Sequence, residues 1–438
     1  MNDARGVATS SSNAKSLEIY ERALRALNVY RGDAAAIIDQ ALAADPEFAM
    51  GHVLRAQVQV TLWERSALPG IGAAVARLEA LHSRMNDRER RHAHALELWA
   101  RGDWEGHRAE LERLTAEVPR DLLALQVGHL ADFYHGDRES LRDRVARALP
   151  AWSREEPGYG FLLGMQAFGL EECGAYAEAE EAGRMALHDE ADDCWAQHAV
   201  AHVLEMQARQ AEGILFMELR RKHWAQEDNG FAFHNWWHTA LYHLDQGKPQ
   251  RALEIYDQGV RPQPSEIRLM MLDAAALLWR MHLRGMDVGR RWEELADAYQ
   301  GGDEDGFYAF NDMHAMMAFV ASGRPKAAGE LLRVVEACAA ARNTNARMER
   351  EVGLPILRAI EAFGRGKYAQ AAALLAPVRA RAHIFGGSHA QRDILSRTLL
   401  EAALCAGDKP LARALAEERA AQKPGCPFTR ELRARAAA

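Results

Sequence analysis

Two stretches in the middle of the chain place histidines four residues apart, a spacing that could support chemistry. They read "WAQHAVAHVLEMQ" and "FHNWWHTALYHLD", and the pairs are His198 with His202 and His234 with His238. On a helix, residues i and i+4 share one face and lie about 6 Å apart. Two imidazoles so placed can bind one metal ion or one substrate, or they can be ordinary polar residues in a wet groove.

A metal site is the first hypothesis. Zinc takes three or four His, Cys or carboxylate ligands, and a catalytic zinc commonly keeps one position for water. The candidate ligands of a divalent metal such as zinc are His198, His202, His234 and His238. Against this hypothesis, the first pair reads "HAVAH" and not HExxH, so the helix-borne general base of zinc proteases is missing. The sequence leaves open whether a metal is bound.

Metal-free acid–base chemistry is the alternative. A histidine beside a carboxylate in a partly desolvated groove can exchange protons near neutral pH. Two pairs have suitable spacing, His202 with Glu205 and His314 with Asp312. No GxSxG motif accompanies them to supply a serine nucleophile. The candidate catalytic residues are His202, Glu205, His238, Asp312 and His314.

Helices must position these residues, because strand signals are nearly absent and apolar residues recur at helical spacing along the chain. Small turn residues recur as well, and most intervals between them have the length of a helix–turn–helix unit. They are Gly32, Gly102, Gly136, Gly174, Ala208, Gly247, Gly285, Gly323, Gly366 and Gly407. A single helix pair cannot bury its apolar face, so neighbouring pairs must stack. The sequence therefore predicts an all-α superhelix of stacked antiparallel helix pairs.

The repeat resembles the tetratricopeptide repeat, and "ALAADP" resembles its closing signature. Several further segments, in order along nearly the whole chain, resemble the tetratricopeptide repeat protein 38 family. They are "DPEFAMGH", "FGLEECGAYAEAE", "HAVAHVLEM", "HNWWHTALYHL" and "GGSHAQRDIL". The resemblance implies a fold and no activity, so it transfers no catalytic residue.

The resemblance also implies a direction for side chains, because the first helix of each tetratricopeptide pair lines the concave face. Counting back from the turn residues puts His, Glu, Asp and Trp side chains from five stretches on that face. The candidate ligand-binding residues there are Glu171, Glu172, His198, His234, Trp236, Trp237, Asp273 and Trp279. Each has an ordinary alternative, since a histidine beside a tryptophan, or a tryptophan pair, is commonly part of the core.

A glycine-rich loop, "FGGSHAQRD", is the last candidate. Gly386 and Gly387 free the backbone, and Ser388 is a good N-cap for the helix that follows. Exposed amides at a helix N-terminus favour a carboxylate or phosphate. The ordinary alternative is a capped helix after a tight loop.

Composition limits the partners and the compartment. A net charge of −8 gives no basic face for nucleic acid, and no apolar run approaches the roughly 18 residues of a membrane span. Five scattered cysteines without a CxxC motif indicate a reducing compartment, so we expect a cytoplasmic protein. We expect a disordered tail over 1–14, one solenoid over 15–425, and a helix end or tail over 426–438.

The function predicted from these residues is binding of a small polar molecule in a concave His/Glu/Asp/Trp pocket, with metal-assisted or acid–base, hydrolase-like chemistry. The alternative is a non-catalytic scaffold that binds a peptide or partner protein along the groove. We expect His198, His202, Glu205, His234 and His238 to share one cavity. We also expect a monomer or a homodimer formed through terminal helices.

Overall fold

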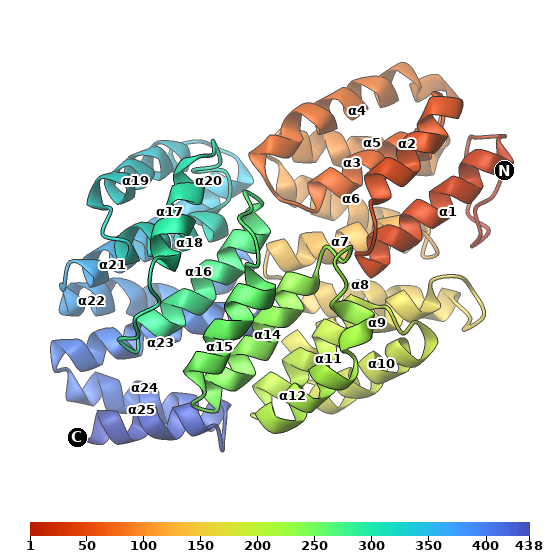
Figure 1. Cartoon of the computed structure of the whole chain (residues 1–438). Coiled ribbons are helices and arrows are strands. Elements are labelled where there is room, and N and C mark those ends of the chain that lie inside the picture. Colours follow the sequence, from red (N-terminus) through yellow and green to blue (C-terminus); the bar gives the residue numbers. More distant parts are fainter. The chain divides into compact units, whose positions relative to one another are not determined.

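A computed structural model describes all residues, 1–438, and consists of helices joined by short loops. It contains no β-strand, only two isolated bridges, Asn2 with Ala8 and Arg31 with Asn229. The helices follow one another as antiparallel pairs, such as α9 (Tyr159–Glu172) with α10 (Tyr176–Asp189), which run side by side (Figure 1). The predicted all-α fold of stacked helix pairs is confirmed. No helix has both the length and the apolar run that crossing a membrane requires.

The chain divides into two compact units. Unit 1 comprises Met1–Val200 and His223–Phe231, and unit 2 comprises Ala201–Lys222 and Ala232–Ala438. The division falls inside the helix α11 (Cys194–Met206). The single solenoid expected over 15–425 therefore stays a prediction.

Unit 1 is built from the helix pairs of the first half of the chain. In order, its helices are α1 (Ala14–Val29), α2 (Ala34–Ala44), α3 (Ala49–Val60), η1 (Arg65–Ala67), α4 (Leu68–Ala80), η2 (His82–Arg84), α5 (Asp87–Ala100), α6 (Trp104–Glu117), α7 (Leu122–Tyr134), α8 (Arg138–Ala148), η3 (Leu149–Ala151), α9, α10 and the start of α11, with α13 (Arg221–Trp224) at the edge of its second segment. The helix α7 lies in its core, since all of α7 except Phe133 is buried.

Unit 2 continues the same pattern. In order, its helices are the end of α11, α12 (Gln210–Leu219), α14 (Ala232–Asp245), α15 (Pro249–Ile255), η4 (Tyr256–Val260), α16 (Arg268–His282), α17 (Arg291–Gln300), α18 (Ala309–Ala321), α19 (Pro325–Ala339), α20 (Thr344–Met348), η5 (Glu349–Gly353), α21 (Leu354–Gly364), α22 (Tyr368–Arg379), η6 (Ala382–Phe385), α23 (His389–Ala406), α24 (Lys409–Gln422) and α25 (Pro427–Ala437). The last of these covers the segment where the sequence predicted a helix end or tail.

The turns between paired helices explain the recurring small residues. Gly174 and Gly247 have φ values of +82° and +74°, the left-handed region in which a side chain is strained. Ala208 takes the same position at φ 57°. The second helix is often capped by an aspartate directly after the turn: Asp103 and Asp137 accept backbone N–H groups at 2.9 and 3.0 Å.

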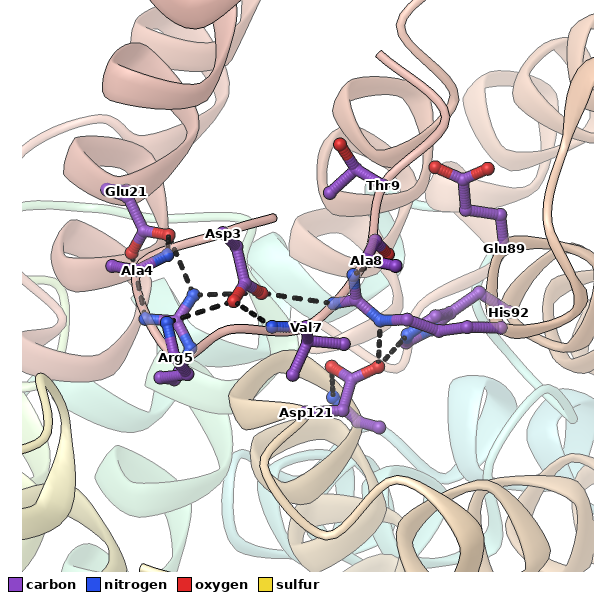
Figure 2. A network of polar contacts seen from close by, with 12 residues as sticks. Asp3, Ala4, Arg5, Val7, Ala8, Thr9, Glu21, Glu89, His92 and Asp121 are labelled. Carbon is purple, nitrogen blue, oxygen red and sulfur yellow. Dashed lines mark hydrogen bonds and ion pairs between the residues drawn. The ribbon is translucent and has the colours of Figure 1, made fainter. Parts of the chain in front are cut away.

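The N-terminal segment, for which the disordered tail over 1–14 stays a prediction, has charged residues with partners in unit 1 (Figure 2). Arg5 donates two hydrogen bonds to Glu21 on α1, both at 2.8 Å. The buried Asp3 carboxylate accepts backbone N–H groups of the segment and forms ion pairs with Arg5 and with Arg88 on α5. The Ser10 N–H donates to Glu89 at 2.8 Å. These ion pairs and hydrogen bonds join the segment to residues of α1 and α5.

Candidate functional site

The predicted site residues fall in both units. Glu171, Glu172 and His198 belong to unit 1, and all the others belong to unit 2. The expected cavity shared by His198 and the other histidines would span the two units, so it stays a prediction. Within unit 2, the structure brings together the remaining members of that set.

Three imidazoles meet in the interior of unit 2. His202 lies on α11, and His234 and His238 lie one turn apart on α14. The ring centroid of His238 is 4.4 Å from that of His202 and 4.9 Å from that of His234. One ring nitrogen from each of the three lies within 4.8 Å of the others. The structure thus brings these three candidate residues together, and their role as metal or substrate ligands stays a prediction.

Two carboxylates form hydrogen bonds with two of these rings and orient them. His234 uses Nδ1 for a hydrogen bond of 2.6 Å to Asp273 on α16, and His238 uses Nδ1 for one of 3.0 Å to Glu205. The second oxygen of Glu205 accepts a hydrogen bond from Nζ of Lys423 at 3.2 Å. Glu205, which the sequence suggested as a partner of His202, therefore orients His238 and neutralises a lysine.

Sequence reasoning missed Lys423. It lies 218 residues from Glu205 along the chain, just beyond the end of α24, and is buried. No local pattern distinguishes it from a surface lysine, and its burial is accompanied by the Glu205 carboxylate that it contacts and by the nearby Asp393 carboxylate. A lysine ammonium inside a protein requires such a partner, because an unpaired buried charge is costly.

Burial and neighbouring charges shift the pKa values of Glu205 and His238. Burial alone would raise the pKa of Glu205, but the Lys423 ammonium and the His238 hydrogen bond outweigh it and hold that pKa well below its ordinary range. Burial and the neighbouring His202 lower the pKa of His238 to about 3, against the opposing effect of Glu205. Near pH 7 Glu205 is therefore a carboxylate and His238 a neutral imidazole, the form that can bind a metal ion.

The tryptophans on α14 have packing partners. Trp237 is fully buried, stacks on His234 with ring centroids 5.4 Å apart, and lies under the Arg280 guanidinium at 5.2 Å. Trp236 is half-buried and lies against Gly259 and the Arg221 guanidinium. Trp237 thus packs in the core and Trp236 at its edge, and a ligand-binding role for either stays a prediction.

Trp279 on α16 has a comparable role. It is buried, its indole N–H donates to the Thr398 hydroxyl at 3.0 Å, and its ring stacks on His282 with centroids 5.0 Å apart. These contacts join α16 to α23 and to the end of its own helix. They place Trp279 in the core, as a support of the helices that carry the polar cluster.

The structure does not pair His314 with Asp312, although the sequence suggested such a pair. His314 donates its Nδ1–H to the Phe310 carbonyl at 2.8 Å. Asp312 accepts the Gly306 N–H at 3.0 and 3.2 Å and hydrogen-bonds Glu349. On α18 these two residues are two positions apart, so their side chains point in different directions around the helix.

The glycine-rich loop is a buried helix start. Ser388 accepts the Gln391 N–H at 3.2 Å, and Gln391 accepts the Ser388 N–H at 2.9 Å, which makes a capping box at the start of α23. A Cβ at Gly387 would lie 2.6 Å from the Phe310 ring. This matches the ordinary alternative, and the role of Gly386, Gly387 and Ser388 in anion binding stays a prediction.

The three candidates in unit 1 are also buried. Glu171 and Glu172 lie at the end of α9. His198 on α11 is enclosed by aromatic rings, with centroid distances of 4.9 Å to Phe168, 5.0 Å to Trp195 and 5.3 Å to Phe231. Within unit 1, His198 therefore packs among aromatic rings and does not line an open groove.

Comparison with known proteins gives fold-level similarity at most. No family model matches the chain. Among solved structures, yeast Tom70 is 12% identical over 97% of this chain and 87% of its own, with a TM-score of 0.36. The APC/C hetero-tetramer Cut9-Hcn1 is 14% identical over 97% of this chain and 97% of its own, with a TM-score of 0.32. The P58(IPK) TPR domain is 14% identical over 90% of this chain and 98% of its own, with a TM-score of 0.21. TM-scores below 0.5 are too low to transfer any property of those proteins to this chain.

Proposed function

We propose that this chain is a non-catalytic protein-interaction scaffold and that α12 docks a partner protein. The observation that carries the proposal is the exposure of two leucines one turn apart on that helix. Leu215 is 58% exposed and Leu219 is 71% exposed, whereas large apolar side chains elsewhere are mostly buried. An exposed apolar stripe is a common mark of a protein interaction site.

The stripe on α12 has the composition of a docking surface. Ala211 lies one turn before Leu215, so three apolar side chains follow one another at four-residue spacing. Exposed Glu212 and Glu218 flank them and supply a polar rim. A partner helix with an apolar stripe of its own fits this surface.

The opposite face of α12 fixes its position in unit 2. Gly213, Phe216 and Met217 are buried, and a Cβ at Gly213 would lie 2.5 Å from the ring of Tyr242 on α14. The Tyr242 hydroxyl donates to the Ala201 carbonyl at 2.5 Å. The stripe is therefore presented on a helix that is packed closely against its neighbour, which lowers the entropy cost of binding.

A second candidate function is the small-molecule pocket with acid–base chemistry that the sequence suggested. The buried polar cluster of unit 2 supports it through the His238–Glu205 and His234–Asp273 hydrogen bonds. His202 and His238 are 0% exposed, so a substrate would need an opening of unit 2 to reach them. For this reason we rank the scaffold first. We also propose that the protein belongs to the tetratricopeptide repeat protein 38 family and is a cytoplasmic monomer or dimer.

The test of the scaffold is a comparison of partner capture by three forms of the full chain. They are the wild type, the double variant Leu215→Lys and Leu219→Lys, and the control Val334→Lys, whose residue is exposed on α19. Substitutions at exposed positions change stability by about 0.5 kcal/mol or less, so all three should melt at similar temperatures. Quantitative mass spectrometry after cross-linking should find the same partners with wild type and control, and lose them with the double variant.

Two results would contradict the proposal. Equal recovery of every cross-linked protein with the double variant would show that α12 is not the docking surface. A dimer seen by light scattering and lost in the double variant would assign the stripe to self-association and would replace the proposed partner with a second copy of the chain.

A further inference from the structure

We infer that the interior of unit 2 contains a site for one zinc-class divalent metal ion, held by His202, His234 and His238. This inference is independent of the proposed docking surface on α12. It rests on three imidazoles that converge from two helices and on the carboxylates that orient two of them. Imidazole nitrogen is the ligand type that zinc, cobalt, nickel and copper prefer, whereas calcium and magnesium prefer oxygen.

The positions of the three rings fit coordination to one centre. Zinc binds histidine nitrogen at about 2.0–2.1 Å, so two nitrogens on one tetrahedral zinc lie about 3.3 Å apart. The ring nitrogens of the three histidines already lie within 4.8 Å of one another. Small rotations about χ1 and χ2 close such a difference without movement of the helices. Three histidine ligands leave a fourth position for water or another small donor.

The hydrogen bonds behind the rings point to a metal more specifically than proximity does. A metal-bound histidine almost always donates its other ring N–H to a carboxylate, a carbonyl or a water, which fixes the tautomer and the ring orientation. His234 and His238 both use Nδ1 in this way, toward Asp273 and Glu205. This directs the Nε2 edge of each ring away from its carboxylate. Two histidines on one helix share this arrangement, with carboxylates from two different helices.

Lys423 distinguishes the two carboxylates of the cluster, because it contacts Glu205. Its ammonium contacts Glu205 Oε1, while Oε2 of the same carboxylate contacts His238. Both oxygens of Glu205 thus already have partners, a lysine and a histidine. We therefore expect Glu205 to orient a metal ligand and not to bind the metal itself. The structure assigns the metal-binding role to the three imidazoles and the orienting role to Glu205 and Asp273.

The experiment uses full-length protein purified without an affinity tag. Elemental analysis is followed by removal of metal with a chelator and titration with cobalt(II), whose visible absorption reports tetrahedral coordination by nitrogen. We expect one cobalt ion per chain with a tetrahedral spectrum, and displacement of cobalt by zinc. Full-length protein that takes up no cobalt, or only with the spectrum of an octahedral aquo ion, would overturn the inference.

Variants assign the site to these residues. His238→Gln should lose the tetrahedral spectrum, whereas His314→Gln, which changes a buried histidine of unit 2 outside the cluster, should keep it. Asp273→Asn should retain the spectrum but weaken cobalt affinity by about 10–100-fold, the effect expected when a partner behind a ligand is changed. If His238→Gln fails to fold by circular dichroism, Asp273→Asn decides the assignment. Unchanged cobalt affinity in Asp273→Asn would refute the assignment of the site to these residues. A loss of the tetrahedral spectrum in His314→Gln as large as that in His238→Gln would refute it as well.

Discussion

Replacing Asp121 with alanine should destabilise unit 1 severely, because this buried carboxylate has three partners. It accepts hydrogen bonds from Arg88 Nε at 2.6 Å and from His92 Nε2 at 2.9 Å (Figure 2). It also caps α7 by accepting the Ala124 N–H at 3.1 Å. Removing one member of a buried ion pair costs about 3–5 kcal/mol, because the other charge stays buried without compensation. Loss of an aspartate N-cap costs about 1 kcal/mol.

These magnitudes separate three variants. Asp121→Ala loses both contributions and should lower the free energy of unfolding by about 4–6 kcal/mol. Asp121→Asn keeps a capping oxygen and should lose about 3–5 kcal/mol, the ion-pair part alone. Asp103→Ala is the control: Asp103 is exposed, caps α6 through the Gly106 N–H, and should cost only about 1 kcal/mol.

Urea denaturation followed by circular dichroism measures these differences, and hydrogen exchange of the α7 amides assigns them to unit 1. The reasoning fails if Asp121→Ala costs no more than Asp103→Ala. It also fails if Asp121→Asn is as stable as the wild type, since the asparagine lacks the charge that Arg88 requires.

The same carboxylate predicts a dependence on pH. Burial would raise the pKa of Asp121, but Arg88 and His92 outweigh it and hold this pKa well below its ordinary value. Folded protein therefore keeps the carboxylate charged where the unfolded chain protonates it. The resulting stabilisation is fully present above the unfolded pKa of about 3.9 and is lost as the pH falls toward the folded pKa. In Asp121→Asn this part of the acid sensitivity should be absent.

Two further predictions concern a buried acid and a tight helix contact. Burial raises the pKa of Asp312 to about 7 beside the carboxyl of Glu349, so folding favours the protonated form and stability falls as the pH rises from about 4 through about 7. Asp312→Asn should therefore melt above the wild type at pH values beyond that range, and thermal melts that fall equally in both proteins would contradict this. Gly169→Ala should lower the free energy of unfolding by about 1–3 kcal/mol, because its Cβ would lie 2.5 Å from Cα of Arg142. Gly72→Ala, with nothing within 4 Å, should be neutral or stabilising, and equal urea midpoints for both glycine variants would refute the close contact.

The sequence predicts the helices well because the signals that define them are local. Gly174 marks a turn through its φ of +82°, and the four-residue spacing of His234 and His238 gives them one face of α14. Residues that depend on distant partners are much harder to predict. Nothing near Lys423 or Asp3 in the sequence indicates that either is buried, since Lys423 contacts Glu205 and Asp3 contacts Arg88, both on helices distant in the sequence. Whether such a charged residue is buried therefore depends on ion pairs with distant residues, which composition does not reveal.

Side-chain direction is predicted less well than helix position. Trp237 and His314 lie on helices as expected, but the sequence does not tell whether a first helix faces an open groove or is covered on all sides. In the structure both side chains are buried. Burial depends on how completely neighbouring helices cover a face, and that is a property of the stacked pairs together and not of one helix.

The attachment of the N-terminal segment has a consequence for the order in which unit 1 forms. Asp3 contacts Arg88, and Arg88 contacts Asp121, so this network is complete only after Asp121 has been synthesised. Each helix pair joins residues close in sequence and can form early, whereas joining residue 3 to residue 88 closes a long loop at an entropic cost. During translation the segment around Asp3 thus leaves the ribosome before α5 and α7, but it reaches its final position only after both helices have emerged. Until then the Arg88 side chain lacks one of its two carboxylate partners.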